Sequence, residues 1–436
     1  MTTVEKIKQL GIVGAGGAGF PTYIKLSSKA EIFIVNAAEC EPLLHKDKEL
    51  LRNGIGPFVK GLKICVNRVA ARRCIIGIKA KYGDLIAHLQ QHLPAEFEII
   101  GLKDFYPVGD EVTLIYETTS RIVPPGALPL SQNVVVSNVE TIYNIGSGVP
   151  LTSKYISIGG DVKRPITVKV PIGIPFWEVL SLAQPIPDTY AVIVGGPMMG
   201  KLAQTLDQPV TKTTGGLLVF PTDHPLIRRY RTAAEIRQVN RIGKSACDQC
   251  AICSELCPRH LLGHPIEPHQ AMRQLFFLDP NAPSAPIAPH TLFCCECNLC
   301  SMVSCPEGLY PAQRCMLGQR QAMAAKTTWQ GSVPDKAHPL IDYRRTPVKK
   351  LMARLDLLRF ANTGPLTAVD LKPKQLSVRL DQHIGAPAIA LVDTGAEVKK
   401  GQKIATVGDK LGAEIHAPLD GRVGAVNDQV IVIETV

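Results

Sequence analysis

The sequence predicts a multidomain fold that combines α/β and α+β domains, and four features indicate it. Its 436 residues suffice for two to four domains at about 100–200 residues each. In the N-terminal third, short apolar runs alternate with helix-like stretches, which is typical of a layered α/β domain with a parallel sheet. Two regularly spaced cysteine runs come later, and a region of short strands and turns ends the chain.

The first two domains are expected at residues 1–150 and 151–222. The first, the α/β domain, has expected strands at 32–35, 74–78 and 97–102 and expected helices at 47–69 and 84–93. The second is expected to be a small α+β domain, with strands at 155–158, 167–170 and 191–194 and one helix at 176–183.

The cysteines lie in a third region, residues 223–326, which begins with a basic helical connector at 224–244. A proline-rich stretch at 279–290 divides this region and cannot form a regular element, because its prolines remove backbone donors. Residues 327–375 are expected to form a linker and a basic amphipathic helix at 349–360. In residues 376–436, turns spaced about 8–12 residues apart predict a small flattened β barrel.

The strongest motif is Cys247-x2-Cys250-x2-Cys253-x3-Cys257-Pro258. A second run, Cys294-x2-Cys297-x2-Cys300-x4-Cys305-Pro306, repeats it with one extra residue. This spacing is typical of a two-cluster ferredoxin, in which the fourth cysteine of each run binds the cluster of the other run. We therefore assign one [4Fe–4S] cluster to Cys247, Cys250, Cys253 and Cys305, and the other to Cys294, Cys297, Cys300 and Cys257.

Structural zinc is the alternative to the clusters, because it also binds C-x2-C pairs. The third C-x2-C step and the Cys-Pro endings favour ferredoxin. Of the cysteines outside the assigned set, Cys65 and Cys74 have apolar neighbours and are expected in the core. Cys315 is expected to pack beneath a cluster, and Cys295 is an alternative to Cys294, although Cys294 gives the regular spacing.

A glycine-rich segment, Gly14-Ala15-Gly16-Gly17-Ala18-Gly19, satisfies G-x-G-x-x-G, and Glu39 follows twenty residues after Gly19. Alone, this pattern would suggest a classical dinucleotide-binding fold. Pro21 weakens that interpretation, because it interrupts the helix that should hold the pyrophosphate. We expect the backbone of this segment to lie against a phosphate or a ring; a mobile loop is the alternative.

Three segments resemble the flavin site shared by the RnfC family, from the Rnf complex, and the NADH-binding flavoprotein of respiratory complex I. They are Gly14 to Thr22, Asn36 to Pro42 and Val136 to Thr141. The resemblance implies a Rossmann-like domain that binds FMN and NADH, a soluble-ligand-binding β-grasp domain marked by GGPMMG at 195–200, and the two-cluster module. From Arg379 onward, the chain resembles the barrel-sandwich hybrid domain that RnfC proteins carry at their N-terminus.

The same resemblance implies which residues surround the flavin. Gly14, Gly16, Gly17 and Gly19 would line it, with Lys25 nearby. Asn36, Glu39 and Glu41 would lie on one side, and Asn138, Glu140 and Thr141 would approach the phosphate or ribityl chain. Asp110 and Glu111 occupy the place of an acidic pair that borders flavin and nicotinamide in complex I. Leu26-Ser27-Ser28 replaces an aromatic stretch associated with nicotinamide stacking, which leaves direct nicotinamide binding open.

The permuted domain order is similar to that of the cobalamin (corrinoid) reductases of propanediol-utilisation microcompartments. This resemblance implies electron transfer from NAD(P)H through FMN and two [4Fe–4S] clusters to cobalamin cobalt, with a cobalamin adenosyltransferase as a partner. The alternative is the electron-input component of a membrane ferredoxin:NAD oxidoreductase complex. The basic helix at 349–360 would then dock such a partner, or else a microcompartment shell protein.

Composition and charge argue against several other classes of protein. Apolar residues make up 45% and charged residues 20% of the chain, as in ordinary globular proteins. No segment has the ~18 consecutive apolar residues of a membrane span, and no secretion signal is visible, so we expect a cytoplasmic protein. The net charge of +10 allows acidic partners, but the basic residues are scattered without the interleaved aromatics of a nucleic-acid binder.

Overall fold

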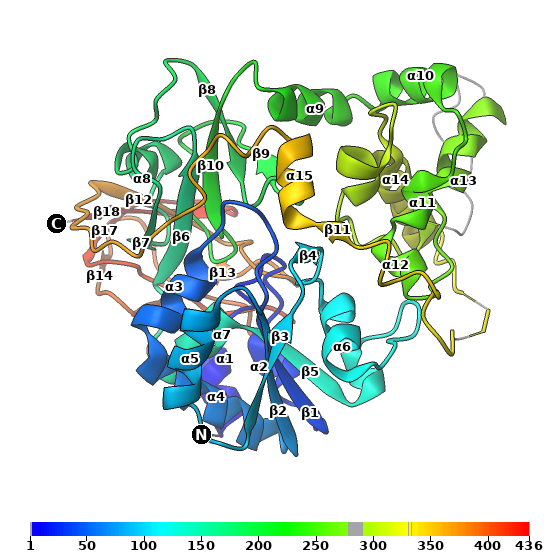
Figure 1. Ribbon diagram of the computed structural model, residues 1–436. Helices are drawn as coiled ribbons and strands as arrows, with labels where there is room; N and C mark the ends of the chain where they lie inside the picture. The colour runs from blue at the N-terminus through cyan, green and yellow to red at the C-terminus, as the bar shows by residue number, and fades with distance from the viewer. Residues whose placement is uncertain (1, 278–290, 330, 333, 436) are drawn as a thin grey trace.

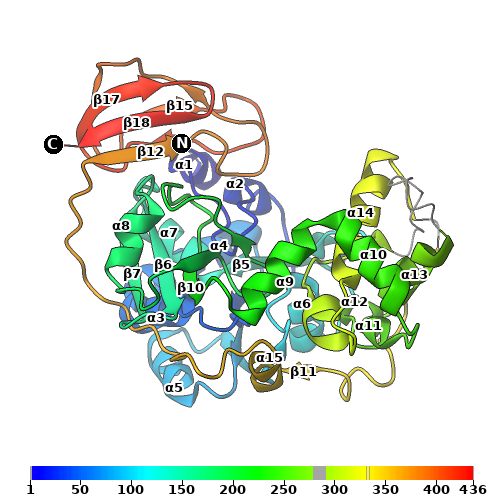
Figure 2. The same ribbon diagram turned by 90° about the horizontal axis from the view of Figure 1, so that it is seen from above.

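The computed structural model describes residues 2–277, 291–329, 331–332 and 334–435, so the proline-rich stretch predicted at 279–290 lies outside the described residues. Figures 1 and 2 show the helical cysteine-rich region beside the N-terminal α/β layer, and the C-terminal strands on another side of the molecule. Figure 2 also shows those strands above α1 and α2, next to the N-terminus. No helix in the described ranges is long and apolar enough to cross a bilayer.

The N-terminal domain is built on a four-stranded sheet in the order β3-β2-β1-β5, in which every pairing is parallel. Its central strands are nearly all apolar because helices cover both faces of such a sheet. The elements are α1 (Thr3–Gln9), α2 (Thr22–Lys25), β1 (Ile32–Ala37), α3 (Lys46–Asn53), α4 (Ile55–Val69), β2 (Arg73–Lys79), α5 (Gly83–His92), β3 (Phe97–Leu102), β4 (Phe105–Tyr106), α6 (Glu111–Thr119), η1 (Pro129–Gln132), β5 (Val134–Asn138) and α7 (Val139–Ser147).

The glycine-rich loop comes before the first strand of this sheet. Val13 and Pro21 form an antiparallel bridge, and the Gly14 N–H donates to the Phe20 carbonyl at 2.8 Å, so the segment between them closes on itself. The next helix, α2, has only four residues. The classical dinucleotide arrangement that the motif alone would suggest is therefore wrong, since the loop does not join a sheet strand to a long helix.

The middle domain is a mixed five-stranded sheet in the order β7-β6-β10-β8-β9. Apolar residues of its strands and of α8 form one core with the C-terminal strands, so these two regions are packed as a unit. The elements are β6 (Ser153–Gly160), β7 (Ile166–Pro171), α8 (Phe176–Ser181), β8 (Tyr190–Val194), β9 (Lys201–Leu202) and β10 (Gly216–Pro221).

The cysteine-rich region consists of short helices and turns. Several of these helices have proline at their first position, where the missing N–H costs no intrahelical bond. The elements are α9 (Pro225–Ala234), α10 (Ile236–Ala246), α11 (Ile252–Glu255), α12 (Pro258–Leu261), α13 (Pro268–Arg273), η2 (Gln274–Phe277), a π-helical turn η4 (Cys300–Ser304) and α14 (Pro311–Ala324).

The basic helix predicted at 349–360 is shorter than expected. Helix α15 spans Val348–Arg354 and follows β11 (Thr346–Pro347), which pairs with β4. Asp356 has a φ of +56°, and the Leu357 N–H donates back to the Met352 carbonyl at 2.9 Å, so the chain reverses there. This reversal brings Leu357 and Phe360 into the core instead of extending the helix.

The C-terminal region forms two small sheets, ordered β12-β18-β17-β14 and β13-β15-β16, in which all strands pair antiparallel. Their inner faces supply apolar residues to the core shared with the middle domain. The strands are β12 (Gln375–Arg379), β13 (Ile389–Ala390), β14 (Glu397–Val398), β15 (Lys403–Thr406), β16 (Ile415–His416), β17 (Gly421–Val426) and β18 (Val430–Thr435).

Candidate functional site

The residues predicted to surround a flavin gather at the carboxyl ends of β1 and β5. These strands are adjacent and parallel, and Asn36 is paired with Asn138 in their register. Glu39 and Glu41 follow β1, whereas Glu140 and Thr141 begin α7 directly after β5. Because α/β sheets bind ligands at this edge, the structure brings both predicted segments to a suitable place.

The glycine-rich loop lies against the same edge. The Ala15 N–H donates to Thr141 Oγ1 at 2.9 Å, and a Cβ on Gly16 would lie 3.6 Å from Asn138 Cβ. Residues 16–18 are exposed, and the φ of +118° at Gly17 is one that glycine adopts most readily. The loop thus presents bare backbone to a ligand, which fits a phosphate or a flat ring.

Glu140 lies beneath this loop and is fully buried. Its carboxylate pairs with the ammonium groups of Lys46, at 3.0 Å, and of Lys154. Burial alone would raise the pKa of Glu140, but the charges of Lys154 and Lys46 outweigh it and lower the pKa. Glu140 and the buried Thr141 therefore support the loop from below, and their approach to a phosphate or ribityl chain stays a prediction.

Sequence reasoning did not identify the partners of Glu140. Lys46 also pairs with Asp47 at 2.6 Å, and Asn138 Nδ2 donates to Asp47 Oδ2 at 2.7 Å. Lys154 comes from β6 of the middle domain, and burial lowers its pKa to about 8. A lysine that is the one charged residue of its strand was the available signal, since such a charge needs a partner when the strand is buried.

Lys25 and Glu111 form an ion pair of 2.7 Å on the more open side of the edge, with 38% of each side chain exposed. Lys25 Nζ also donates to the Val136 carbonyl at 3.2 Å, and Asn36 Nδ2 donates to the Gly109 carbonyl at 2.8 Å. These contacts connect α2, β1, β5 and the start of α6. Lys25, Asn36 and Glu111 therefore lie on segments that meet at this edge, and their contact with a flavin stays a prediction.

Glu41 connects this edge to the GGPMMG turn of the middle domain. Its carboxylate accepts the backbone N–H groups of Met198 at 2.9 Å and Met199 at 3.0 Å. Burial raises the pKa of Glu41 to about 8. Burial and the nearby charge of Asp47 also raise the pKa of Glu39, so this edge carries two carboxyl groups that bind protons more readily than usual.

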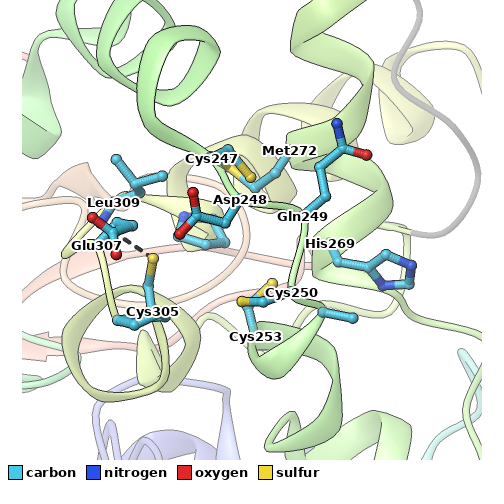
Figure 3. A pocket seen from close by; sticks show the side chains of 13 residues that line it. Cys247, Asp248, Gln249, Cys250, Cys253, His269, Met272, Cys305, Glu307 and Leu309 are labelled. Atoms are coloured by element: carbon cyan, nitrogen blue, oxygen red, sulfur yellow. Dashed lines mark hydrogen bonds between the residues drawn. The ribbon is translucent and has the colours of Figure 1, made fainter.

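The first group of cysteines surrounds one pocket. Cys247, Cys250, Cys253 and Cys305 line it, together with apolar groups from Met272, Leu309 and Pro311. Figure 3 shows Cys247, Cys250 and Cys253 on one segment and Cys305 on another, with Cys305 held by a hydrogen bond from the Leu309 N–H. The set contains the fourth cysteine of the second run, which is the exchange that the ferredoxin pattern predicts. The donors and their apolar surroundings fit an iron–sulfur cluster.

A second pocket is lined by the other predicted set, Cys257, Cys294, Cys297 and Cys300. Cys295 and Cys315 line it as well, so six thiols are available to four positions and the choice of ligands stays a prediction. Cys65 and Cys74 lie in the core of the α/β domain. Among the described residues, no three Cys, His, Asp or Glu side chains are grouped to hold a single metal ion, so the assignment of the two pockets to clusters rests on the cysteines that line them.

The second cysteine pocket adjoins the edge at the carboxyl ends of β1 and β5, called the flavin edge below, through three direct contacts. The Tyr106 hydroxyl donates to the Cys297 carbonyl at 2.8 Å, and Asn298 Nδ2 donates to the Met198 carbonyl at 2.8 Å. Arg259, two residues after Cys257, pairs with Asp110 at 2.8 Å. The segments that line the second pocket and the segments at the flavin edge are thus held together by side chains of both groups.

Three known domain families match this chain. The Nuo51 FMN-binding domain matches residues 7–147, the 4Fe-4S dicluster domain matches residues 246–310, and the RnfC barrel sandwich hybrid domain matches residues 359–435. The predicted FMN-binding, dicluster and C-terminal barrel-sandwich regions are therefore confirmed.

Whole-chain comparison decides the family. The chain is 42% identical to Cobalamin reductase PduS of Salmonella typhimurium over 435 residues, which cover 98% of this chain and 95% of that protein. The chain belongs to the PduS cobalamin reductase family. PduS of Citrobacter freundii is 41% identical over 438 residues, covering 99% of this chain and 96% of the relative. The predicted resemblance to this family is confirmed.

More distant relatives match a smaller share of this chain. A component of the Na(+)-translocating ferredoxin:NAD(+) oxidoreductase complex of Acetobacterium woodii is 35% identical over 269 residues, 59% of this chain and 58% of the relative. Among solved structures, NAD+-reducing [NiFe]-hydrogenase in the air-oxidised state has a TM-score of 0.48 and 22% identity. That match covers 81% of this chain and 67% of the hydrogenase chain. The PduS family thus accounts for the whole chain, including its C-terminal barrel.

Proposed function

We propose that this protein reduces cobalamin cobalt with electrons from NAD(P)H, by way of FMN and two [4Fe–4S] clusters. The observation that carries the proposal is the identity of 42% with a PduS cobalamin reductase over nearly the full length of both chains. Bound FMN would accept two electrons from a nicotinamide and release them singly, and each cluster would carry one electron. Reduction of a corrinoid in single-electron steps requires such a conversion.

The chain's own residues would hold FMN at the edge formed by β1 and β5. Gly16 and Gly17 supply an exposed backbone surface without bulky side chains, and Gly14 and the buried Gly19 form the two ends of this loop. Asn36 and Asn138 supply amide groups beside it. Lys25 would contribute a positive charge, and its pairing with Glu111 fixes its direction. Glu140 would keep the loop in place through Thr141 and the two buried lysines.

The contacts between domains support an order for the two cysteine pockets. The pocket of Cys257, Cys294, Cys297 and Cys300 is joined to the flavin edge by Tyr106 and Asn298, whereas Cys250 in the other pocket is exposed. The pocket beside the flavin edge would receive electrons from the flavin, and the pocket with Cys250 would pass them outward. The identity to PduS supports cobalamin as the electron acceptor of this chain. We propose that a cobalamin adenosyltransferase is the partner that receives the reduced cobalamin.

The middle domain is proposed to be a soluble-ligand-binding β-grasp domain. Its mixed sheet with one packed helix supports this assignment, and its GGPMMG turn contacts Glu41 at the flavin edge. We further propose that the protein acts in the cytoplasm, inside the microcompartment of propanediol utilisation, in keeping with its similarity to two PduS proteins over nearly the full chain.

The experiment is an anaerobic stopped-flow assay on the purified holoprotein. NADH should bleach the flavin absorbance, and addition of aquocobalamin should then restore the oxidised flavin while cob(II)alamin absorbance appears. A control with Cys297→Ala should bleach with NADH but reduce cobalamin much more slowly. Flavin bleaching without any cobalamin reduction by the wild-type protein would contradict the proposed acceptor.

A second candidate is the electron-input component of a ferredoxin:NAD oxidoreductase complex. The match to a component of such a complex, which covers 59% of this chain, favours this candidate. The same stopped-flow assay with oxidised ferredoxin in place of aquocobalamin separates the two. Faster reoxidation by ferredoxin than by cobalamin, together with co-purification of hydrophobic membrane proteins, would support this candidate.

A further inference from the structure

The C-terminal barrel contacts the glycine-rich loop although nearly the whole chain lies between them in sequence. The Ile384 N–H donates to the Gly19 carbonyl at 3.1 Å. A Cβ on Gly19 would lie 3.4 Å from His383 Cα, and 2.7 Å from Thr213 Cγ2 of the middle domain. The end of the loop is therefore enclosed by the barrel and the middle domain together, and Figure 2 shows the barrel over this part of the molecule.

The beginning of the loop is held by a buried lysine. Lys212 Nζ donates to the Gly11 carbonyl at 2.8 Å and to the Glu414 carbonyl at 2.6 Å, and the Lys212 N–H donates to Gln382 Oε1 at 2.9 Å. Lys212 is only 1% exposed. One amino group from the middle domain thus joins a residue just ahead of the loop to the barrel.

The junction is closely packed, which makes it sensitive to small changes. Gly11 has a φ of +65°, and a Cβ there would lie 2.2 Å from the Glu414 carbonyl oxygen. Val13, directly before the loop, forms a small apolar cluster with Leu151, Ile172 and the barrel residue Ala413. Neither end of the loop can move without disturbing the barrel.

We propose that Lys212 is a positioning residue for the flavin site, which makes the affinity for FMN depend on docking of the C-terminal barrel. The inference rests on the proposed function, because it takes the glycine-rich loop to be the FMN-binding segment. The barrel, at the C-terminal end of the chain, is then a structural part of the flavin site. It supports the glycine-rich loop through non-covalent contacts.

The first test replaces Lys212 by Met in the full-length protein. FMN is added to flavin-depleted wild-type and Lys212→Met protein, and the dissociation constant is measured by quenching of FMN fluorescence. Loss of the buried hydrogen bonds should raise the dissociation constant about tenfold, while the iron content stays the same. Lys410→Met is the matched control, since Lys410 is an exposed lysine of the barrel, and it should bind FMN like the wild type.

A second variant tests the same interface in case Lys212→Met does not fold. Lys8 Nζ donates to the Gly408 carbonyl at 2.9 Å, and Lys403 Nζ donates to Gln9 Oε1 at 2.7 Å, both at the exposed rim of the same interface. The double variant Lys8→Met/Lys403→Met should bind FMN more weakly and should speed hydrogen exchange at the amides of residues 11–19.

The outcomes separate this inference from the proposed function. Wild-type protein that binds no FMN would contradict the proposed function. Wild-type protein that binds FMN, with an unchanged dissociation constant in folded Lys212→Met, would overturn the role of Lys212. If Lys212→Met does not fold, unchanged FMN binding and unchanged exchange in the double variant would overturn the inference instead.

Discussion

Arg259 and Asp110 form a hydrogen-bonded ion pair of 2.8 Å between the cysteine-rich region and the flavin edge. Both side chains are largely buried, and Asp110 also accepts the Thr113 N–H at 3.0 Å as the N-cap of α6. Arg259 follows Cys257, and Glu111 follows Asp110, so the pair joins a proposed cluster-binding segment to a proposed flavin-binding segment. Its removal should disturb the alignment of the two sites.

Replacing Arg259 by Met should uncouple these segments. Removal of Arg259 leaves the largely buried Asp110 charge with only the hydrogen bonds from Thr113, which costs up to about 3–5 kcal/mol. We expect flavin bleaching by NADH to stay fast and the subsequent electron transfer to cobalamin to slow markedly in stopped-flow traces. The double variant Arg259→Met/Asp110→Asn keeps a cap on α6 and removes the stranded charge, so it should recover part of the stability. If urea unfolding showed the same loss of stability in the single and the double variant, the ion pair would not be the cause of that loss.

The exchange of fourth cysteines between runs predicts a specific pairing of spectra. Cys305→Ala should remove the same paramagnetic resonance signal from dithionite-reduced protein as Cys250→Ala, because both residues line the first pocket. Cys257→Ala should resemble Cys297→Ala for the same reason. Each variant should retain about half of the wild-type iron and sulfide. If Cys305→Ala instead matched Cys297→Ala, each run would bind its own cluster. Cys65→Ala serves as a control at a core thiol.

Glu140→Gln should strongly destabilise the α/β domain. The substitution leaves Lys46 and Lys154 buried with less negative charge around them, and breaking a buried pair in this way costs about 3–5 kcal/mol. Glu111→Gln is the matched control, because the exposed pair with Lys25 contributes only about 0–1 kcal/mol. Urea unfolding followed by circular dichroism compares the two, and equal midpoints would show that the buried network contributes little.

Glu41 should make stability depend on pH. Burial raises its pKa from an ordinary value of 4.5 to about 8, so between these values the folded chain holds a proton that the unfolded chain releases. Stability should therefore fall as the pH rises from about 4.5 to 8, with a slope of up to about 1.4 kcal/mol per pH unit from this group. Glu41→Gln should flatten the dependence of the urea midpoint over this range. An unchanged slope would mean that Glu41 is ionised in the folded protein.

The parts of the molecule that depend on local spacing were predictable. Cysteines three residues apart and followed by proline indicate a ferredoxin-type module because cluster ligands come from one short turn, and the dicluster family match agrees. The alternation of apolar runs with helices predicted the parallel sheet, since buried parallel strands are apolar on both faces. The end of α15 was predicted wrongly, because the amphipathic pattern continues through Leu357 and Phe360 while the backbone reverses at Asp356.

The residues that link the sites were not predictable from any motif. Tyr106 and Arg259 occupy ordinary positions in sequence, and their importance comes from partners 191 and 149 residues away. Lys154 is the one charged residue of β6, an internal strand, but its acceptor is known only from its burial beside Glu140. The placement of Glu140 and Thr141 beneath the glycine-rich loop likewise depends on how α7 packs under it.

By itself, the sequence determined the kinds of cofactor site and the order of domains, because ligand spacing, glycine-rich segments and strand periodicity are local properties of the chain. Tertiary structure alone decided which side chains connect those domains. A buried polar group such as the Lys212 amine must find its acceptors wherever the fold supplies them, and here one of them lies 202 residues away at Glu414.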